Sequence, residues 1–184
     1  MSTSASVVFS VFNSATDPRL QGWLSLRGHL EPDNFATERP VRSPRRGDAR
    51  GETAAETSRA PQAGIWRLLA TNGRELGRSS SVYGAFAVAR AHVLDLQSEV
   101  DRMVATTVTG PTAGTHGWVM SVDTVPVMTS GRWYATTSTT REACAGAREA
   151  FRSALVTADA RQLVQPGARR PRAPIRPTGL TGRW

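Results

Sequence analysis

Residues 64–79 carry the hydrophobic pattern of a β-hairpin. Apolar and polar residues alternate along the first half of this stretch. This alternation places Trp66, Leu68 and Ala70 on one face of a strand. Asn72-Gly73 then indicates a tight primed turn, because both residues tolerate a positive φ. Residues 74–79 are the predicted return strand.

A second hairpin pattern begins about fifty residues later. Residues 117–122 repeat the alternation, with Trp118, Met120 and Val122 in the places of the first three apolar residues. Residues 125–129 are the predicted return strand, and residues 132–135 are candidates for extending the sheet.

Each hairpin pattern is followed by a helical one. The first helix is predicted to start near Ala85, with an apolar stripe at three-and-four spacing formed by Phe86, Ala89, Val93, Leu96 and Val100. The second helix has Thr139 or Thr140 as its predicted cap. Its apolar stripe is formed by Ala143, Ala147, Ala150, Phe151 and Ala154. Two hairpin–helix units in tandem predict an internal duplication.

The first thirty residues predict a separate hairpin. Residues 7–12 have strand composition, residues 22–27 suit a second short strand, and residues 13–18 between them are turn-forming types. This pattern leaves open whether the N-terminal hairpin packs on the rest of the protein.

The remaining segments are polar. Residues 31–63 combine prolines with charged and small residues, and because they can bury little apolar surface they are predicted to be a disordered linker. The predicted fold class is α+β, in which two tandem β-hairpin–helix repeats form a small antiparallel sheet with helices on one face. Its segments are an N-terminal hairpin (1–30), the linker (31–63), repeat one (64–104), a connector (105–116), repeat two (117–161) and a disordered basic tail (162–184).

Charge changes this picture mainly at the C-terminus. All 23 basic residues are arginine and the formal net charge is +8, although a GC-rich genome explains arginine usage before any selection for phosphate binding. The six arginines of the linker are balanced by six acids, and residues 64–161 carry ten arginines against eight acids. The tail has no acid and holds Arg169, Arg170, Arg172, Arg176 and Arg183. A flexible basic arm of this kind attracts polyanions in a salt-sensitive way.

Few residues suggest chemistry. His29, His92 and His116 lack the spacing of metal ligands, so no metal site and no cofactor is predicted. His92 and Asp95 lie one helical turn apart, which suits a solvated helix face. Cys144 lies near a helix start, where a thiol can be activated, but its alanine neighbours indicate a packing position. With no catalytic motif in the sequence, we expect the protein not to be an enzyme.

Aromatic residues have two alternative roles. Trp66 and Trp118 hold equivalent strand positions, where core packing is the simpler interpretation and stacking on bases or a ligand is the alternative. Arg132, Trp133 and Tyr134 adjoin one another and are the better candidates for an exposed aromatic–basic patch. Together with the tail arginines, these three are the predicted polyanion-binding residues.

Cysteine content and hydropathy indicate a compartment. The single cysteine excludes an internal disulfide and favours a reducing, cytoplasmic setting. No stretch reaches the roughly eighteen apolar residues that span a bilayer, and the first residues lack the basic region of a signal peptide. We therefore expect a soluble protein with no membrane partner.

Residues 66–73, Trp-Arg-Leu-Leu-Ala-Thr-Asn-Gly, together with Leu76, residues 79–81 and Tyr83, resemble the YegP-like family of small bacterial repeats. Residues 139–151 resemble the helix of that family, whereas the second unit has Asp-Thr-Val-Pro at residues 123–126 in place of the Asn-Gly turn. The resemblance covers about half of the chain. It implies a sheet with helices on one face and a pseudo-symmetric pair of repeats. It implies no activity, because the role of the family is unsettled and a fold does not define a function.

The expected function is that of a non-enzymatic binding or assembly module. Such a module self-associates or docks a protein partner, and the basic tail adds weak attraction to a polyanion. The alternative is a nucleic-acid-binding accessory protein in which the tail acts together with residues 132–134. An enzyme ranks below both.

Overall fold

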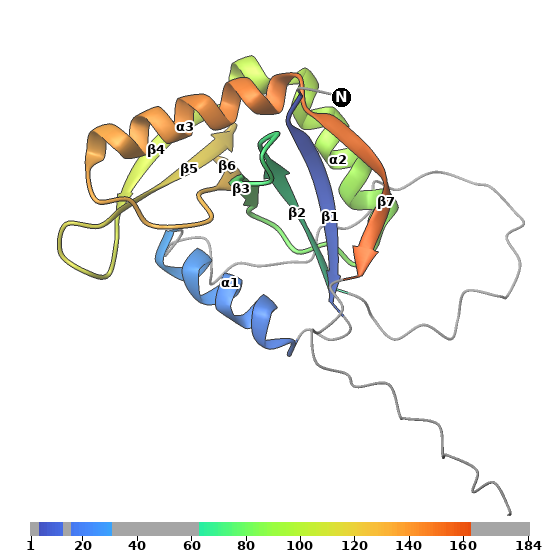
Figure 1. The fold of residues 1–184 in the computed structure, drawn as a ribbon, viewed down its shortest axis with the longest axis horizontal. Helices are drawn as coiled ribbons and strands as arrows, with labels where there is room; N and C mark the ends of the chain where they lie inside the picture. Colours follow the sequence, from blue (N-terminus) through green and yellow to red (C-terminus); the bar gives the residue numbers. More distant parts are fainter. Residues whose placement is uncertain (1–3, 13–15, 31–62, 163–184) are drawn as a thin grey trace, which may run out of the picture.

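A seven-stranded sheet runs through the described part of the chain (Figure 1). The computed structural model describes residues 4–12, 16–30 and 63–162. The described elements, in chain order, are β1 (Ser6–Phe12), α1 (Pro18–Leu30), β2 (Ala63–Leu69), β3 (Glu75–Ser79), α2 (Phe86–Ser98), the short 3-10 helix η2 (Val100–Arg102), β4 (Val104–Thr109), β5 (His116–Val122), β6 (Val125–Thr129), α3 (Thr137–Arg152) and β7 (Leu155–Gln162). The predicted α+β class is therefore confirmed.

The strands lie in the order β4-β5-β6-β3-β2-β1-β7. All neighbouring pairs are antiparallel except β1 and β7, which are parallel. β1 therefore lies between β2 and β7. The sequence left open whether the N-terminal segment packs on the rest of the protein, and the position of β1 shows that it does. The N-terminal segment is part of the folded sheet.

The two faces of the sheet have different covers. Figure 1 shows α2 and α3 along the upper side of the sheet and α1 below it. Trp66 of β2 lies in the large core cluster with residues of α2 and α3, whereas its neighbour Ile65 clusters with Trp23 of α1. Because alternate strand residues point to opposite faces, α1 packs opposite the other two helices. The predicted placement of the two repeat helices on one face is confirmed for α2 and α3, whereas α1, which the sequence did not predict as a helix, packs on the other face.

The predicted second N-terminal strand, residues 22–27, is wrong because it lies within α1. Asp17 begins this helix, since its carbonyl accepts from the amide of Gln21 and its carboxylate accepts from the amide of Arg19. Pro18 then takes the first helical position, which needs no N–H. The buried residues of α1 repeat at three-and-four spacing: Leu20, Trp23, Arg27 and Leu30. That period marks a helix.

The predicted segment boundaries also need correction. Residues 104–109 form the strand β4, so the first part of the predicted connector (105–116) belongs to the sheet. The composition of β4, Val-Ala-Thr-Thr-Val-Thr, is rich in β-branched residues that favour strands. β7 was not predicted either. Apart from Ala63 in β2 and Gln162 in β7, the predicted linker and tail lie outside the described residues.

The two helices predicted after the hairpins are confirmed. α2 buries Ala89, Val93 and Leu96 from the expected stripe. The cap of α3 is Thr136 rather than Thr139 or Thr140, because the hydroxyl of Thr136 accepts from the amide of Thr139 at 3.2 Å. α3 thus begins earlier, at Thr137, and it buries Thr140, Cys144, Ala147 and Phe151.

The primed turn was predicted at Asn72-Gly73, between β2 and β3, but it lies between β5 and β6. Asp123 and Thr124, which link β5 to β6, have φ values of 50° and 70°. In the β2–β3 hairpin the positive φ, 77°, belongs to Gly73 alone, and the pairing shifts register between Leu68 and Leu69. The β2–β3 turn is therefore of the wider kind that carries a bulge, in which glycine supplies the left-handed residue.

The two hairpins join where β3 meets β6. This β3–β6 junction has two residue pairs, Arg78 with Thr129 and Ser79 with Met128. On the core side, Gly77 leaves room for the neighbouring hairpin, because a Cβ atom there would lie 2.8 Å from Trp118 Cη2 and 3.0 Å from Met128 Sδ. Trp66 and Trp118 are both fully buried, which confirms core packing as their role. The core therefore crosses the junction without a break.

We predict that Gly77→Ala destabilises the protein by about 1–3 kcal/mol, since the added methyl overpacks the β3–β6 junction. Gly22→Ala is the matched control: a Cβ there meets nothing within 4 Å, and alanine favours the helix that contains it. Urea unfolding of both variants tests this prediction. Equal stability of Gly77→Ala and the wild type would show that Trp118 does not pack closely on β3.

Candidate binding site at the β4 edge

β4 ends the sheet on one side and leaves one of its own edges open. Among the described strands its only neighbour is β5, and the six residue pairs between them run without a register shift. β4 contains no proline and no charged residue, and Val104 is 65% exposed. Proteins usually protect edge strands with charges, prolines or bulges. This regular, uncharged edge has none of these protections.

The direction of the β4 backbone groups follows from the neighbouring strand. The carbonyl of Trp118 in β5 accepts from Ser130 on the β6 side, so Val119 directs its polar groups toward β4. Thr106 is the partner of Val119, so its backbone N–H and C=O groups point toward β5. By alternation, Ala105, Thr107 and Thr109 direct their N–H and C=O groups away from the sheet. These three residues form the open hydrogen-bonding edge.

A hollow of about 320 Å³ lies between β4 and α3, beside the open edge. Ala105 and Thr107 pair with Met120 and Trp118, whose side chains lie in the core cluster that includes buried residues of α3. Their own side chains consequently face the same side, and both are small. The lining of this α3–β4 hollow includes Ala105, Thr107, Met120, Arg141, Cys144 and Arg148.

Two arginines of α3 border the hollow. Arg141 and Arg148 are two helical turns apart on one side of α3, and both are exposed. The nearest ion pairs of α3 involve Arg152, which binds Asp101 and Glu149. Within the described ranges, no carboxylate forms an ion pair with Arg141 or Arg148. The hollow therefore carries two guanidinium groups that form no ion pair in these ranges, although the charge of Arg148 also helps to lower the pKa of Asp101.

Cys144 lies at the buried side of the hollow. Its side chain is in the core cluster, as the sequence indicated, and burial raises the pKa of the thiol to about 11, while Arg148 opposes the shift. The thiol is therefore protonated at neutral pH and is a poor nucleophile. A protonated, buried thiol does not suit the hollow to thiol chemistry.

The predicted aromatic–basic residues 132–134 lie in the loop between β6 and α3. Arg132 is exposed, and its guanidinium lies 5.1 Å from the ring centroid of Tyr134. Trp133 is half-buried against the backbone of β5, since a Cβ atom on Gly117 would lie 2.9 Å from its ring. Tyr134 is also half-buried, and its backbone pairs with His116. Of these three residues Arg132 alone is exposed, and polyanion binding by them stays a prediction.

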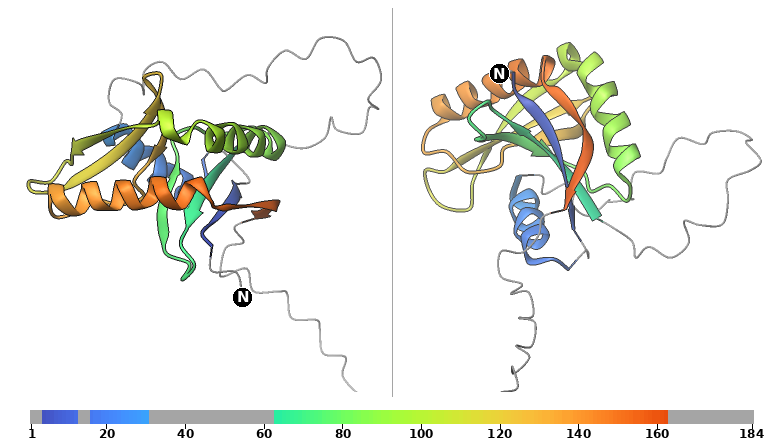
Figure 2. Two further views of the ribbon diagram at one scale, coloured as in Figure 1. Left: turned by 90° about the horizontal axis from the view of Figure 1, so that it is seen from above. Right: turned by 45° about the vertical axis from the view of Figure 1, so that its right-hand side comes forward.

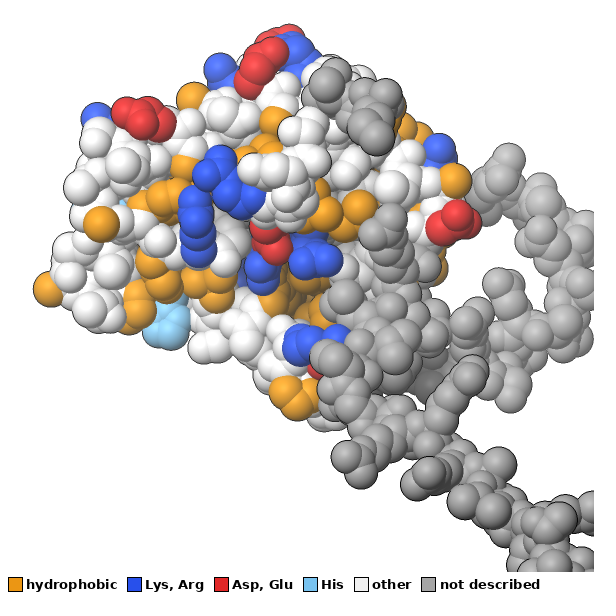
Figure 3. Space-filling view, in the orientation of Figure 1, with side chains coloured by type: hydrophobic (Ala, Val, Ile, Leu, Met, Phe, Trp, Pro, Cys, Tyr) orange, Lys and Arg blue, Asp and Glu red, His pale blue; other side chains and the backbone are white. Residues whose placement is uncertain are grey.

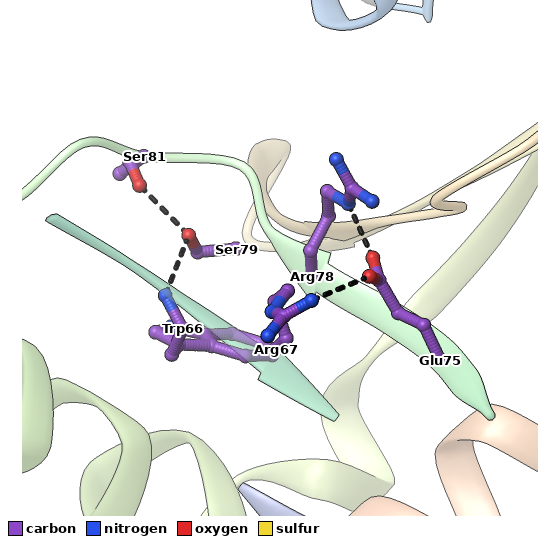
Figure 4. A network of polar contacts seen from close by, with 6 residues as sticks. All are labelled: Trp66, Arg67, Glu75, Arg78, Ser79 and Ser81. Carbon is purple, nitrogen blue, oxygen red and sulfur yellow. Dashed lines mark hydrogen bonds and ion pairs between the residues drawn. The ribbon is translucent and has the colours of Figure 1, made fainter. Parts of the chain in front are cut away.

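A second cluster of charges, which the sequence did not indicate, lies on the strands themselves. Arg67 and Arg78 face each other across β2 and β3, and Glu75 forms ion pairs with both (Figure 4). Figure 3 shows basic side chains around an acidic one in the middle of this view of the surface. One carboxylate thus offsets part of the positive charge on the face that α1 partly covers.

His92 belongs to a buried hydrogen-bond chain rather than to a solvated helix face. The indole N–H of Trp66 donates to the hydroxyl of Tyr83 at 3.3 Å, and that hydroxyl lies 2.6 Å from His92 Nδ1. Burial raises the pKa of Tyr83, so its proton stays available for donation to the imidazole. Burial also lowers the pKa of His92, although Asp95 and Glu99 oppose the shift. The chain ties α2 to β2.

No group of three or more metal-ligating side chains occurs within residues 4–12, 16–30 and 63–162. Over the same ranges, no helix is both long enough and apolar enough to cross a membrane. The five tail arginines predicted to bind polyanions lie outside these ranges.

Comparison with known proteins gives one structural similarity. No family model matches the chain, and no curated protein matches it. The chain is similar to the solution NMR structure of YegP from E. coli, a protein of unknown function, with 18% identity over 56% of this chain and 86% of that one and a TM-score of 0.41. A similarity at this identity and TM-score supports no conclusion about the family or the activity of the chain.

The half-buried imidazole of His92 predicts a specific dependence of stability on pH. Because the pKa of His92 in the folded protein lies below the value of about 6.5 in an unfolded chain, the unfolded state binds a proton first as the pH falls. The contribution of neutral His92 to the free energy of unfolding should be fully present above about pH 6.5 and should be lost as the pH falls below that value. Urea unfolding at about pH 7.5 and about pH 5.5 measures this. His92→Gln should remove most of the difference, and an unchanged difference would assign it to another group.

Proposed function

We propose that this protein is a non-enzymatic binding module that docks an extended protein segment along β4. The carrying observation is the open edge formed by Ala105, Thr107 and Thr109, in a strand with no proline, charge or register shift. An extended segment that pairs with such an edge gains main-chain hydrogen bonds, and its alternate side chains enter neighbouring pockets. The α3–β4 hollow lies where such a pocket is needed.

The β7 edge, at the opposite end of the sheet, is less suited than β4 to pairing with another chain. β7 carries the charged residue Asp159, and its pairing with β1 shifts register between Val7 and Phe9. Charges and irregular pairing are the usual protection of an edge against other chains. β4 is consequently the edge we propose for docking, whether the docked segment comes from a partner protein or from a second copy.

We also propose that the two hairpin–helix units arose by duplication. In both hairpins a serine hydroxyl accepts from the amide of the buried tryptophan: Ser79 from Trp66 at 3.3 Å, and Ser130 from Trp118 at 3.2 Å. Ser79 also donates to the carbonyl of Ser81, as Figure 4 shows. This shared contact supports a common origin, although the turns of the two hairpins differ.

The basic tail supports a secondary, electrostatic role. Its five arginines and absence of acids suit weak attraction to a polyanion, and nucleic acid is the alternative partner. Arg132, exposed on the β6–α3 loop, is the folded-domain residue best placed to assist.

Thr107→Pro tests strand docking directly. Proline removes an N–H that points away from the sheet, so the β4–β5 ladder is preserved while the open edge loses a donor. We expect at least about tenfold weaker binding of extended peptides with little change in melting temperature. Thr107→Val, which keeps the N–H, is the control and should bind like the wild type. Equal binding by Thr107→Pro would refute docking along β4.

Truncation after Gln162 tests the role of the tail. The full chain should bind single-stranded DNA at low salt, with an affinity that falls as salt rises, and the truncated chain should lose most of that affinity. Filter binding over a salt series measures both. If the truncated chain keeps the affinity, the folded part and not the tail carries the interaction.

A further inference from the structure

We propose that the segment docked on β4 is acidic, and that Arg141 and Arg148 select it by binding carboxylates that reach the α3–β4 hollow. This inference rests on the proposed function and adds the chemistry of the partner. The two guanidinium groups border the hollow, are exposed, and form no ion pair within the described part of the chain.

The geometry of strand addition brings the partner's side chains to these arginines. Residues of an added strand that lie opposite Ala105 and Thr107 direct their side chains to the same face as those two residues. That face is the side of the sheet where α3 packs, because the β5 partners of Ala105 and Thr107 lie in the core cluster that includes α3 residues. Alternate residues of the docked segment therefore point toward the hollow and its arginines.

The chemistry of the hollow favours a carboxylate over an apolar side chain. Within the described residues, the charged groups that line the hollow are the guanidinium groups of Arg141 and Arg148. Guanidinium forks are the usual bidentate partners of carboxylates. An aliphatic side chain would leave the arginines without an anion.

The same charges argue against a second copy as the occupant. Two copies paired through β4 would bring Arg141 and Arg148 of both copies to one junction. β4 contributes no acidic residue that offsets four arginines there. Like charges at an interface disfavour association. The observations therefore favour an acidic segment of a different protein.

Fluorescence anisotropy with two octapeptides tests the inference on the full chain. One peptide alternates glutamate with valine, and the other alternates glutamine with valine, so the two differ only in charge. We expect the glutamate peptide to bind about tenfold more tightly at low salt, with a smaller difference at high salt. In Arg141→Gln/Arg148→Gln the two peptides should bind equally. Arg74→Gln/Arg90→Gln, a control with the same net charge, should keep the preference.

The outcomes separate the inference from the function on which it rests. Equal binding of both peptides by the wild type, or a preference that survives in Arg141→Gln/Arg148→Gln, overturns the acidic selection and leaves strand docking intact. If neither peptide binds, strand docking itself fails, and the inference fails with it. A concentration-dependent dimer in light scattering that the glutamate peptide does not dissociate would assign the edge to a second copy and overturn the inference.

Discussion

The close packing of Trp118 against β3 is the contact on which the rest of this structure depends. Two hairpins meet through only two residue pairs, Arg78 with Thr129 and Ser79 with Met128. So short a ladder contributes little by itself, and the burial of large side chains across it supplies most of the stability. Gly77 permits that burial because it has no side chain in the space that Trp118 and Met128 occupy. With the hairpins joined, α3 contacts β3, β4 and β5 together.

This arrangement also explains why the two edges of the sheet differ. On one side the sheet ends at β7, the last described strand, which pairs in parallel with β1 and contacts α2. On the other side, α3 contacts β4 but leaves most of its residues exposed, and the small residues Ala105 and Thr107 line the hollow. Figure 2 shows from two further directions how α3 runs along the sheet toward β4. The candidate site is thus a consequence of a helix that covers the sheet incompletely.

The sequence predicted elements well where a period was long and regular, and poorly where it was short. β2, β3, β5, β6 and α2 followed from alternation or three-and-four spacing. The pattern of residues 22–27 predicts a strand because Trp23 and Leu24 suit either structure, and only the longer spacing from Leu20 to Leu30 distinguishes a helix from a strand. β4 has no buried apolar stripe to reveal it. The site was missed for the same reason: no local pattern places Arg141 and Arg148 beside a strand over thirty residues away.

Amide hydrogen exchange along β4 tests the central claim most directly. In the free protein, Thr106 and Val108 should be protected by β5, whereas Ala105, Thr107 and Thr109 should exchange quickly. When the peptide of alternating glutamate and valine is added to saturation, these three amides should become protected, because each N–H then donates to the added strand. Unchanged exchange at all three amides, with the peptide bound, would contradict docking along the β4 edge.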